Sequence, residues 1–337
     1  MSKARGLADL GNVYNDGALS NRNLIINGAM QVAQRGVSNG PNQLDGCLSL
    51  DRWSVNSSGG TKTISQEEFT VGQTDVPDFP KYYMRFAVSA GDNNLGVHQS
   101  VEDVTVLGGK TVTLSFWAKG TNPASGSFVS SWIQFFGSAG SASVETEAKS
   151  GMVLTSSWQK FTITFDVPSI SGKTVGASSY TWVEVLRQPA TDTGTSAWTA
   201  DICQVQLEVG DTSTPFEHRS FDQENTLCQR YFQRYGAGAT DGRIGVGGWN
   251  NSTSADMLIS LTHEMRVTPT VSAPSKGRVL DFAVAWYPIT SFITGESTTK
   301  TVNIGATISG TSGAAQGDSA FLGGGGGAYD YQMDAEL

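Results

Sequence analysis

The sequence is poor in charge, and most of the charge it carries is of one sign. Charged side chains make up 16% of its 337 residues, against about a quarter in typical soluble domains, and the net charge is −9. An acidic chain lacks the cationic field that attracts phosphate groups, so we expect no nucleic-acid partner and no binding to anionic membranes. No run of about 18 apolar residues occurs, which predicts no membrane insertion. Residues 1–23 lack the apolar core of a signal peptide, which predicts synthesis in a cytoplasm.

Residues that usually carry catalysis or bind metals are also scarce. The three cysteines are far apart, which argues against a disulfide framework or a zinc site and predicts small buried side chains: Cys47, Cys203 and Cys228. The three histidines are isolated from one another, and no phosphate-binding loop, dinucleotide fingerprint or serine-hydrolase motif is present. We therefore expect no enzyme and no cofactor. A pair of carboxylates that cleaves a polysaccharide stays open, because its spacing is set by the fold.

What the sequence has is glycine, hydroxyl side chains and aromatic residues in alternating patterns. Its 40 glycines separate short runs of period two, and 8 Trp, 15 Phe and 9 Tyr can bury a large core. In 111–119, Val112, Leu114, Phe116 and Ala118 share one face, with Trp117 on the other. Such runs recur from 24 to 210 and predict an antiparallel jelly-roll sandwich.

One segment has helical periodicity instead. In "SFDQENTLCQRYFQRY" (220–235) the apolar residues recur at helical spacing, Ser220 and Gln223 form a capping box, and Gly236 supplies a stop. The spacing predicts a helix of about three turns that connects two β-regions. The fold class expected is therefore all-β, with the following parts: an N-terminal arm at 1–20, a jelly-roll domain at 21–219, a linker helix at 220–236 and a C-terminal β-sandwich domain at 237–337.

Two loops of the C-terminal region look suited to ligand binding. "GGWNNSTSAD" and "WYPITSFITGES" each combine aromatic and polar residues between strands, and an aromatic plate beside amides is the chemistry that a glycan needs. The expected ligand-binding residues are Trp249, Asn250, Asn251, Trp286 and Tyr287, with the face of Trp117 on the first domain as the next candidate. The alternative is that Trp249 and Trp286 point into the core.

Several segments, taken in order, carry a family resemblance. "NLIINGAMQVAQRG", "LDRWSV", "TLSFWAKG", "SSWQKFTITFDVP" and "VQLEVGDTSTPFEHRSFDQENTLCQRYFQRY" resemble bacteriophage tail fibre and related virion appendage proteins over about 21–235. The first domain resembles carbohydrate-binding modules of the jelly-roll type. In that resemblance the opening motif is the first edge strand, Asn27-Gly28 is its turn, and Trp53 seals the core.

The resemblance implies a function and partners. It implies a structural, receptor-binding virion protein that is made in the host cytoplasm, forms homotrimers, attaches to other virion proteins through 1–20 and binds a host surface glycan or protein. It also implies a structural Ca²⁺ near the ends of the jelly roll, held by Asn23, Asn27 and Asp201. Two alternatives stay open: a head fibre or capsid decoration protein without an adsorption role, and a polysaccharide depolymerase.

Overall fold

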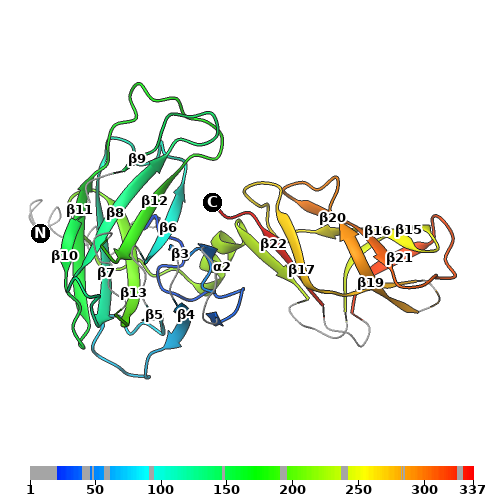
Figure 1. Ribbon diagram of the computed structural model, residues 1–337, viewed down its shortest axis with the longest axis horizontal. Helices are drawn as coiled ribbons and strands as arrows, with labels where there is room; N and C mark the ends of the chain where they lie inside the picture. The colour runs from blue at the N-terminus through cyan, green and yellow to red at the C-terminus, as the bar shows by residue number, and fades with distance from the viewer. Residues whose placement is uncertain are drawn as a thin grey trace, which may run out of the picture. The chain divides into compact units, whose positions relative to one another are not determined.

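A computed structural model describes residues 21–39, 46–47, 49–56, 61–90, 95–145, 149–189, 196–236, 242–281, 283, 285–324 and 329–337. The chain divides into two compact units, which we call unit 1 (up to Glu224, with Leu337) and unit 2 (Asn225–Glu336). Each unit is built almost wholly from antiparallel strands (Figure 1), which confirms the all-β prediction. The predicted arm at 1–20 lies outside the described residues.

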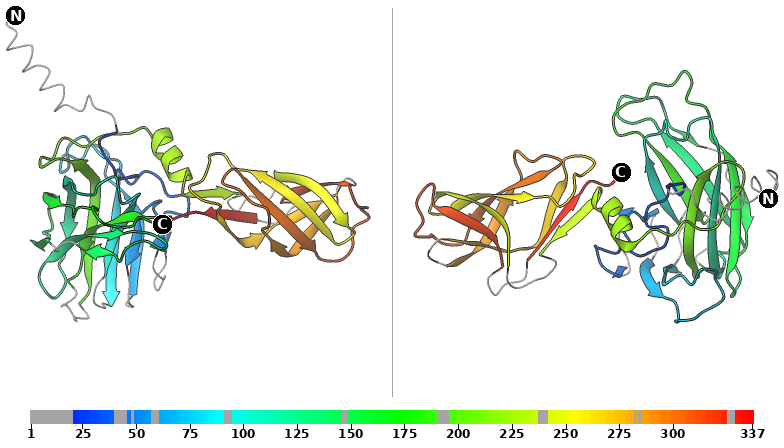
Figure 2. Two further views of the ribbon diagram at one scale, coloured as in Figure 1. Left: turned by 90° about the horizontal axis from the view of Figure 1, so that it is seen from above. Right: turned by 180° about the vertical axis from the view of Figure 1, so that it is seen from behind.

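Unit 1 is a sandwich of two sheets. Sheet A has the strand order β1-β4-β5-β13-β7-β11, with bounds Ser38–Asn39, Thr61–Glu68, Tyr82–Ala90, Trp198–Val209, Thr111–Gly120 and Gln159–Asp166. Sheet B has the order β10-β8-β12-β6-β3-β2, with β9 beside β8; their bounds are Lys149–Met152, Phe128–Phe135, Tyr180–Arg187, Gly96–Glu102, Ser54–Asn56, Gly46–Cys47 and Val144–Glu145. Figures 1 and 2 show the two sheets facing one another. One apolar core lies between them, and its large side chains include Trp53, Phe86, Phe116, Trp132 and Trp198. The prediction that Trp53 lies in the core is confirmed.

The opening motif is not an edge strand, which corrects the prediction. Residues 22–25 are extended without a strand ladder, and the turn follows at 26–29. The Arg219 guanidinium donates to the carbonyls of Asn23 and Ile25, and it pairs with the Glu224 carboxylate at 2.9 Å. That carboxylate accepts the backbone N–H of Asn27. The segment is held both by charged side chains from 217–224 and by single backbone bonds to β13, from Leu24 N to the Leu207 carbonyl at 2.9 Å and from Val205 N to the Gly28 carbonyl at 3.0 Å.

The helix is shorter than predicted. Helix α2 spans Phe221–Gln229, and its capping box forms as expected, with Ser220 Oγ accepting the Gln223 N–H at 3.3 Å. The next residues form strand β14 (Phe232–Tyr235), which pairs with the C-terminal strand β22 (Tyr329–Asp334). Backbone pairing along a whole edge outweighs one more helical turn, because short helices are marginal by themselves. With nine residues, the one helix in the described part of the chain is too short and too polar to cross a membrane.

Unit 2 contains a closed ring of strands where the sequence predicted a sandwich. Its barrel has the order β15-β16-β20-β19-β18-β21, with bounds Arg243–Asn251, Ser254–Ser260, Thr301–Ile308, Trp286–Ile293, Arg278–Leu280 and Ser319–Gly323. Unit 2 also has a second sheet with the order β14-β22-β17, in which β17 spans Thr270–Lys276. Along β22 the side chains of Tyr329, Tyr331 and Met333 are buried, and so is that of Asp330.

Candidate functional site

Trp117 lies on the outer face of sheet A, as its place in the alternation predicts. On β7 the side chains of Leu114, Phe116 and Ala118 enter the core, while Trp117 is half-buried on the opposite face. The pleat of the strand enforces this choice, because successive side chains point to opposite faces. Across the sheet, Trp117 is paired with Lys160 on β11 and Cys203 on β13.

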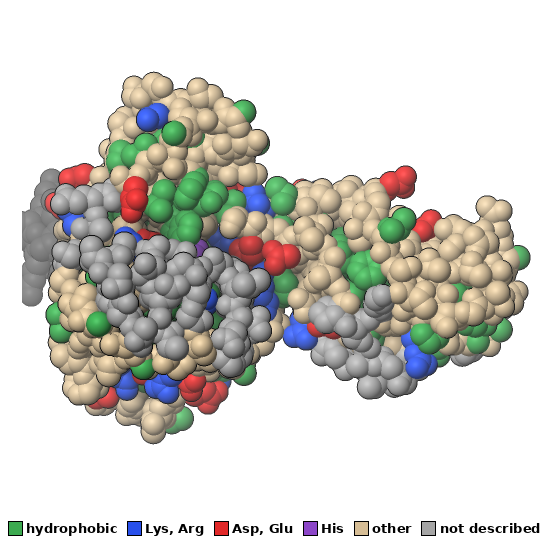
Figure 3. All heavy atoms as spheres, in the orientation of Figure 1, with side chains coloured by type: hydrophobic (Ala, Val, Ile, Leu, Met, Phe, Trp, Pro, Cys, Tyr) green, Lys and Arg blue, Asp and Glu red, His purple; other side chains and the backbone are tan. Residues whose placement is uncertain are grey.

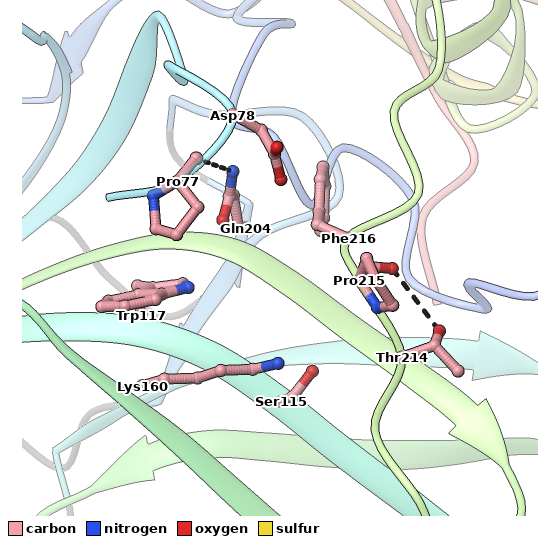
Figure 4. A pocket seen from close by; sticks show the side chains of 9 residues that line it. All are labelled: Pro77, Asp78, Ser115, Trp117, Lys160, Gln204, Thr214, Pro215 and Phe216. Atoms are coloured by element: carbon pink, nitrogen blue, oxygen red, sulfur yellow. Dashed lines mark hydrogen bonds between the residues drawn. The ribbon is translucent and has the colours of Figure 1, made fainter. Parts of the chain in front are cut away.

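Two loops stand over this face and make it concave. A cavity of about 240 Å³, which we call the Trp117 cavity, is lined by nine residues (Figure 4): Pro77, Asp78, Ser115, Trp117, Lys160, Gln204, Thr214, Pro215 and Phe216. In Figure 4 the side chains of Trp117, Lys160 and Ser115 rise from the sheet, and Asp78 and Phe216 face them from the loops. The cavity therefore combines a rigid floor with two loop walls.

Hydrogen bonds fix both walls. A bulge in β13 between Cys203 and Gln206 turns Gln204 toward the β4–β5 loop, where its Nε2 donates to the Pro77 carbonyl at 2.9 Å. On the other side, Gln206 Nε2 donates to the Pro215 carbonyl at 3.1 Å, and the Glu217 N–H donates to Gln206 Oε1 at 2.7 Å. The walls are thus tied to β13, so the cavity is preformed.

The polar groups of the cavity include a cation that no other described residue engages. Lys160 has no hydrogen-bond or ion-pair partner in the described parts of the chain, and no described ring or cation lies against Trp117. The one lining carboxylate, Asp78, lies 3.9 Å from His218. Glycoside cleavage uses two flanking carboxylates, and the lining of this cavity contains one.

A second aromatic group occupies the same outer face. Phe69, Tyr83 and Trp158 form a triangle with ring centroids 4.9 to 5.6 Å apart. Beneath it, Asp201 accepts two hydrogen bonds from Arg85, at 2.7 and 2.8 Å, and lies 4.0 Å from the Lys119 ammonium. The hydrogen bond to Asp201 raises the pKa of Arg85. Asp201 is therefore part of a charge network within sheet A.

The predicted Ca²⁺ ligands do not fit a metal site. Asn23 Oδ1 accepts the N–H groups of Ile25 and Leu207, both at 3.0 Å, and Asn27 Oδ1 accepts the N–H of Val32 at 3.0 Å. The Asp201 carboxylate accepts two hydrogen bonds from Arg85 and lies 4.0 Å from the Lys119 ammonium. Each of these oxygens already has protein donors, and the described residues contain no group of three or more His, Cys, Asp and Glu that could hold a metal. The expectation of calcium thus gains no support from these three residues.

The ligand site predicted in unit 2 is wrong in its central residue. Trp249 is 1% exposed and belongs to the barrel core, with its ring 5.9 Å from that of Tyr287 at 88°. Burying the large apolar surface of a tryptophan stabilises the fold more than exposing the ring on a loop would, so Trp249 lies in the core. Trp286 is half-buried on β19, and the Tyr287 hydroxyl donates to Asp281 at 3.1 Å.

The two asparagines of this prediction are exposed, but they serve the hairpin. Asn250 Nδ2 donates to Asp256 at 2.9 Å, and Asn251 Oδ1 accepts from the backbone and hydroxyl of Thr253, both at 2.8 Å. These bonds close the turn between β15 and β16. Of the predicted binding residues, Trp117 lines the cavity described above.

Sequence analysis missed the partners of Trp117. Lys160 could have been found from the alternation of 159–166, which puts it on an outer face. Gln204 could not, because a bulge leaves no mark on the pattern of apolar residues. Asp78 and Phe216 come from loops whose path depends on the folded sheet.

No family model matches the sequence, and comparison with curated proteins finds no match. Solved structures with some similarity include the enzymatically active domain of bacteriophage CBA120 tailspike protein 4, at 13% identity and a TM-score of 0.35, over 56% of this chain and 22% of that domain. They also include a CBM4 structure, at 18% identity and a TM-score of 0.29, over 47% of this chain and 95% of that one. A third is the CBM22-1–GH10 structure of Clostridium thermocellum xylanase 10B with xylohexaose, at 10% identity and a TM-score of 0.34, over 57% and 29%. Because every TM-score is below 0.5, none of these similarities bears on function.

Proposed function

We propose that this chain is a non-enzymatic component of a phage virion, a tail fibre or a similar appendage, and that it binds a host-surface glycan in the Trp117 cavity. The observation that carries the binding role is a half-buried tryptophan on a rigid sheet, beside an unpaired lysine and between two fixed walls. An aromatic ring in a preformed concave site with a few polar groups is the usual composition of a small-ligand site. The virion role rests on the motif order in 21–235.

The chemistry of the cavity narrows the ligand. A sugar ring can lay its apolar C–H face on Trp117 while one of its hydroxyl groups bonds to Ser115. The Lys160 ammonium suits a glycan that carries a carboxylate or a phosphate, because a charge-assisted hydrogen bond is about twice as strong as a neutral one. An acidic host polysaccharide is therefore the proposed ligand class.

Assembly and attachment complete the proposal. The chain forms a homotrimer, which multiplies a weak glycan site by avidity, and residues 1–20 attach it to other virion proteins. Some apolar residues of 220–235 are buried within the chain, and others are available for a trimer contact. Tyr231 and Phe232 are 3% and 1% exposed within the chain, while Phe221 and Leu227 of α2 stay exposed. Light scattering that finds a stable monomer at micromolar concentration would reject the trimer.

The binding role is tested by Trp117→Ala in a pull-down of purified host surface polysaccharide. We expect loss of binding with an unchanged unfolding transition, because Trp117 is outside the core. Trp158→Ala is the matched control, since it removes a half-buried tryptophan of the same outer face beyond the cavity. Equal binding by Trp117→Ala and the parent chain would reject the cavity as the site.

The virion role has its own tests. Antibody labelling of phage particles should place the chain on an appendage, and labelling of the head would favour the capsid decoration alternative. Deleting residues 1–20 should leave the fold intact and abolish incorporation into particles. Incubation with the polysaccharide should leave its chain length unchanged, and shortening would favour the depolymerase.

A further inference from the structure

Sheet B also carries aromatic residues on its outer face, and these are separate from the residues around Trp117 on sheet A. Phe135 on β8 stacks on Tyr180 of β12, with centroids 4.7 Å apart and planes at 26°, and on Trp182, at 5.8 Å and 27°. Trp182 in turn lies 3.9 Å from the ring of His98 on β6. Figure 3 shows hydrophobic side chains gathered over the ends of β8 and β12. The four rings form one continuous stack in the order Tyr180, Phe135, Trp182 and His98.

A second cavity opens at the Tyr180 end of this stack of rings. It has a volume of about 460 Å³, and we call it the Tyr180 cavity. It is lined by Phe135, Phe136, Gly137, Ser138, Ser141, Ser143, Ala177, Ser178 and Tyr180. None of the nine is charged, and four are serines, so the lining combines aromatic surface with hydroxyl groups.

The walls of the Tyr180 cavity are rigid. The loop after β8 and the loop before β12 are joined by backbone bonds, from Ser138 N to the Ala177 carbonyl at 2.9 Å and from Gly176 N to the Phe136 carbonyl at 2.7 Å. A Cβ atom at Gly176 would lie 1.8 Å from the Ser138 carbonyl oxygen, so only glycine lets the loops approach this closely. Ser178 on the rim has a φ of 58°, a left-handed conformation that residues other than glycine seldom adopt.

Tyr180 has what a sugar contact requires. Its ring is half-buried, and its hydroxyl has no hydrogen-bond partner among the described residues. A buried tyrosine hydroxyl normally has a hydrogen-bond partner. Since the Tyr180 hydroxyl has none among the described residues and lies at a cavity, it is available to a ligand. None of the nine lining residues is charged, and the Lys173 ammonium lies 5.8 Å from the centroid of the Phe136 ring.

We propose that the Tyr180 cavity is a second carbohydrate-binding site, which takes a neutral sugar ring against Tyr180 and bonds its hydroxyl groups through the serines. The proposal extends the glycan-binding role proposed above, and it rests on that role. The two sites lie on different sheets of one sandwich and differ in charge, so unit 1 would hold an acidic and a neutral glycan at once.

The test measures calorimetric binding of four neutral hexaoses, namely cellohexaose, maltohexaose, mannohexaose and xylohexaose, to the full chain. We expect at least one to bind with a dissociation constant of about 1 mM or lower. Tyr180→Ala should weaken that binding at least about tenfold, and Tyr180→Phe, which keeps the ring, should stay within about threefold. Ser143→Trp changes an exposed residue of the rim and should block the cavity without altering the core. This variant tests the site even if Tyr180→Ala folds poorly.

Trp117→Ala separates this proposal from the proposed function. It should leave neutral hexaose binding unchanged while it abolishes binding of the acidic polysaccharide. Failure of all four hexaoses to bind would overturn the second site and leave the first intact. So would hexaose binding by Tyr180→Ala and Ser143→Trp that equals binding by the parent chain. If the parent chain binds no hexaose but self-associates, and Tyr180→Ala abolishes that self-association, the stack of rings is instead a contact between copies of this chain.

Discussion

Trp117 in unit 1 and Trp249 in unit 2 are both strand tryptophans, but they face opposite ways. The neighbours of Trp117 at 112, 114, 116 and 118 are apolar and occupy the inner face, so Trp117 must point outward. The neighbours of Trp249 on its own face are Gly245 and Gly247, which leave the interior of the barrel to be filled by the larger ring. Val246, on the opposite face, is 58% exposed. A tryptophan is thus directed outward only where other side chains have already filled the core.

Replacing each of these tryptophans should give opposite results, and this is the largest effect expected. Trp249→Ala removes a fully buried ring and should lower the free energy of unfolding of unit 2 by about 3–5 kcal/mol. Trp117→Ala should change the stability of unit 1 by less than about 1 kcal/mol. Urea unfolding of both variants measures the difference. Similar losses in the two variants would show that Trp117 is also a core residue.

Acid should destabilise unit 1 through a histidine inside sheet B. Burial first, and the charge of Arg52 second, lower the pKa of His98 from 6.5 to about 3. The unfolded chain then binds a proton that the folded chain does not, so stability is full above pH 6.5 and falls as the pH drops toward 3. From pH 7 to pH 4 the loss should be about 3 kcal/mol.

His98→Gln isolates this contribution. Thermal unfolding of the parent chain and of the variant at a series of pH values should give a difference in stability that shrinks as the pH falls from 7 to 4. A difference that stays constant over this range would mean that His98 takes up its proton in the folded state. The transition of unit 2 in the same scans serves as an internal reference.

Two adjacent glycines of β15 should respond unequally to alanine. A Cβ atom at Gly247 would lie 1.8 Å from the Asp256 carbonyl oxygen, while one at Gly248 would lie 3.5 Å from the nearest atom, an ordinary contact. Gly247→Ala should cost about 1–3 kcal/mol through the forced backbone shift, and Gly248→Ala should be close to neutral. Equal midpoints in urea would contradict the close packing that lets Trp249 fill the barrel.

Lys160→Met should produce the smallest effect and sharpen the contrast between the two cavities. We expect about tenfold weaker binding of an acidic polysaccharide, or about 1.4 kcal/mol, and a weaker dependence of binding on salt. Binding of neutral hexaoses should not change, because the Tyr180 cavity has no charged lining residue. A parallel loss for acidic and neutral glycans would show that the two cavities are coupled.

Much of unit 1 could be predicted from the sequence, because its strands have strict alternation. The core face of β7, the outward position of Trp117 and the capping box at Ser220 all depend on residues within a few positions of one another. The errors arose where distant residues decide the outcome. Helix α2 ends at Gln229 because β22, a hundred residues later in the chain, pairs with the segment that follows. The opening motif forms no strand, and distant residues hold it: Arg219 and Glu224 bind its backbone, and the Leu207 carbonyl of β13 accepts the N–H of Leu24.

The sequence by itself determined the class of the fold, the inner and outer faces of its regular strands, and the absence of local motifs for metal or nucleotide binding. Those properties follow from local periodicity and composition. The tertiary structure alone decided which side chains meet. A bulge turned Gln204 toward Pro77, loops brought Asp78 and Phe216 over Trp117, and tight glycine contacts closed the loops above Tyr180. Both cavities are made by segments far apart in the chain, and their approach is set by packing and long-range hydrogen bonds that leave no repeating pattern in the sequence.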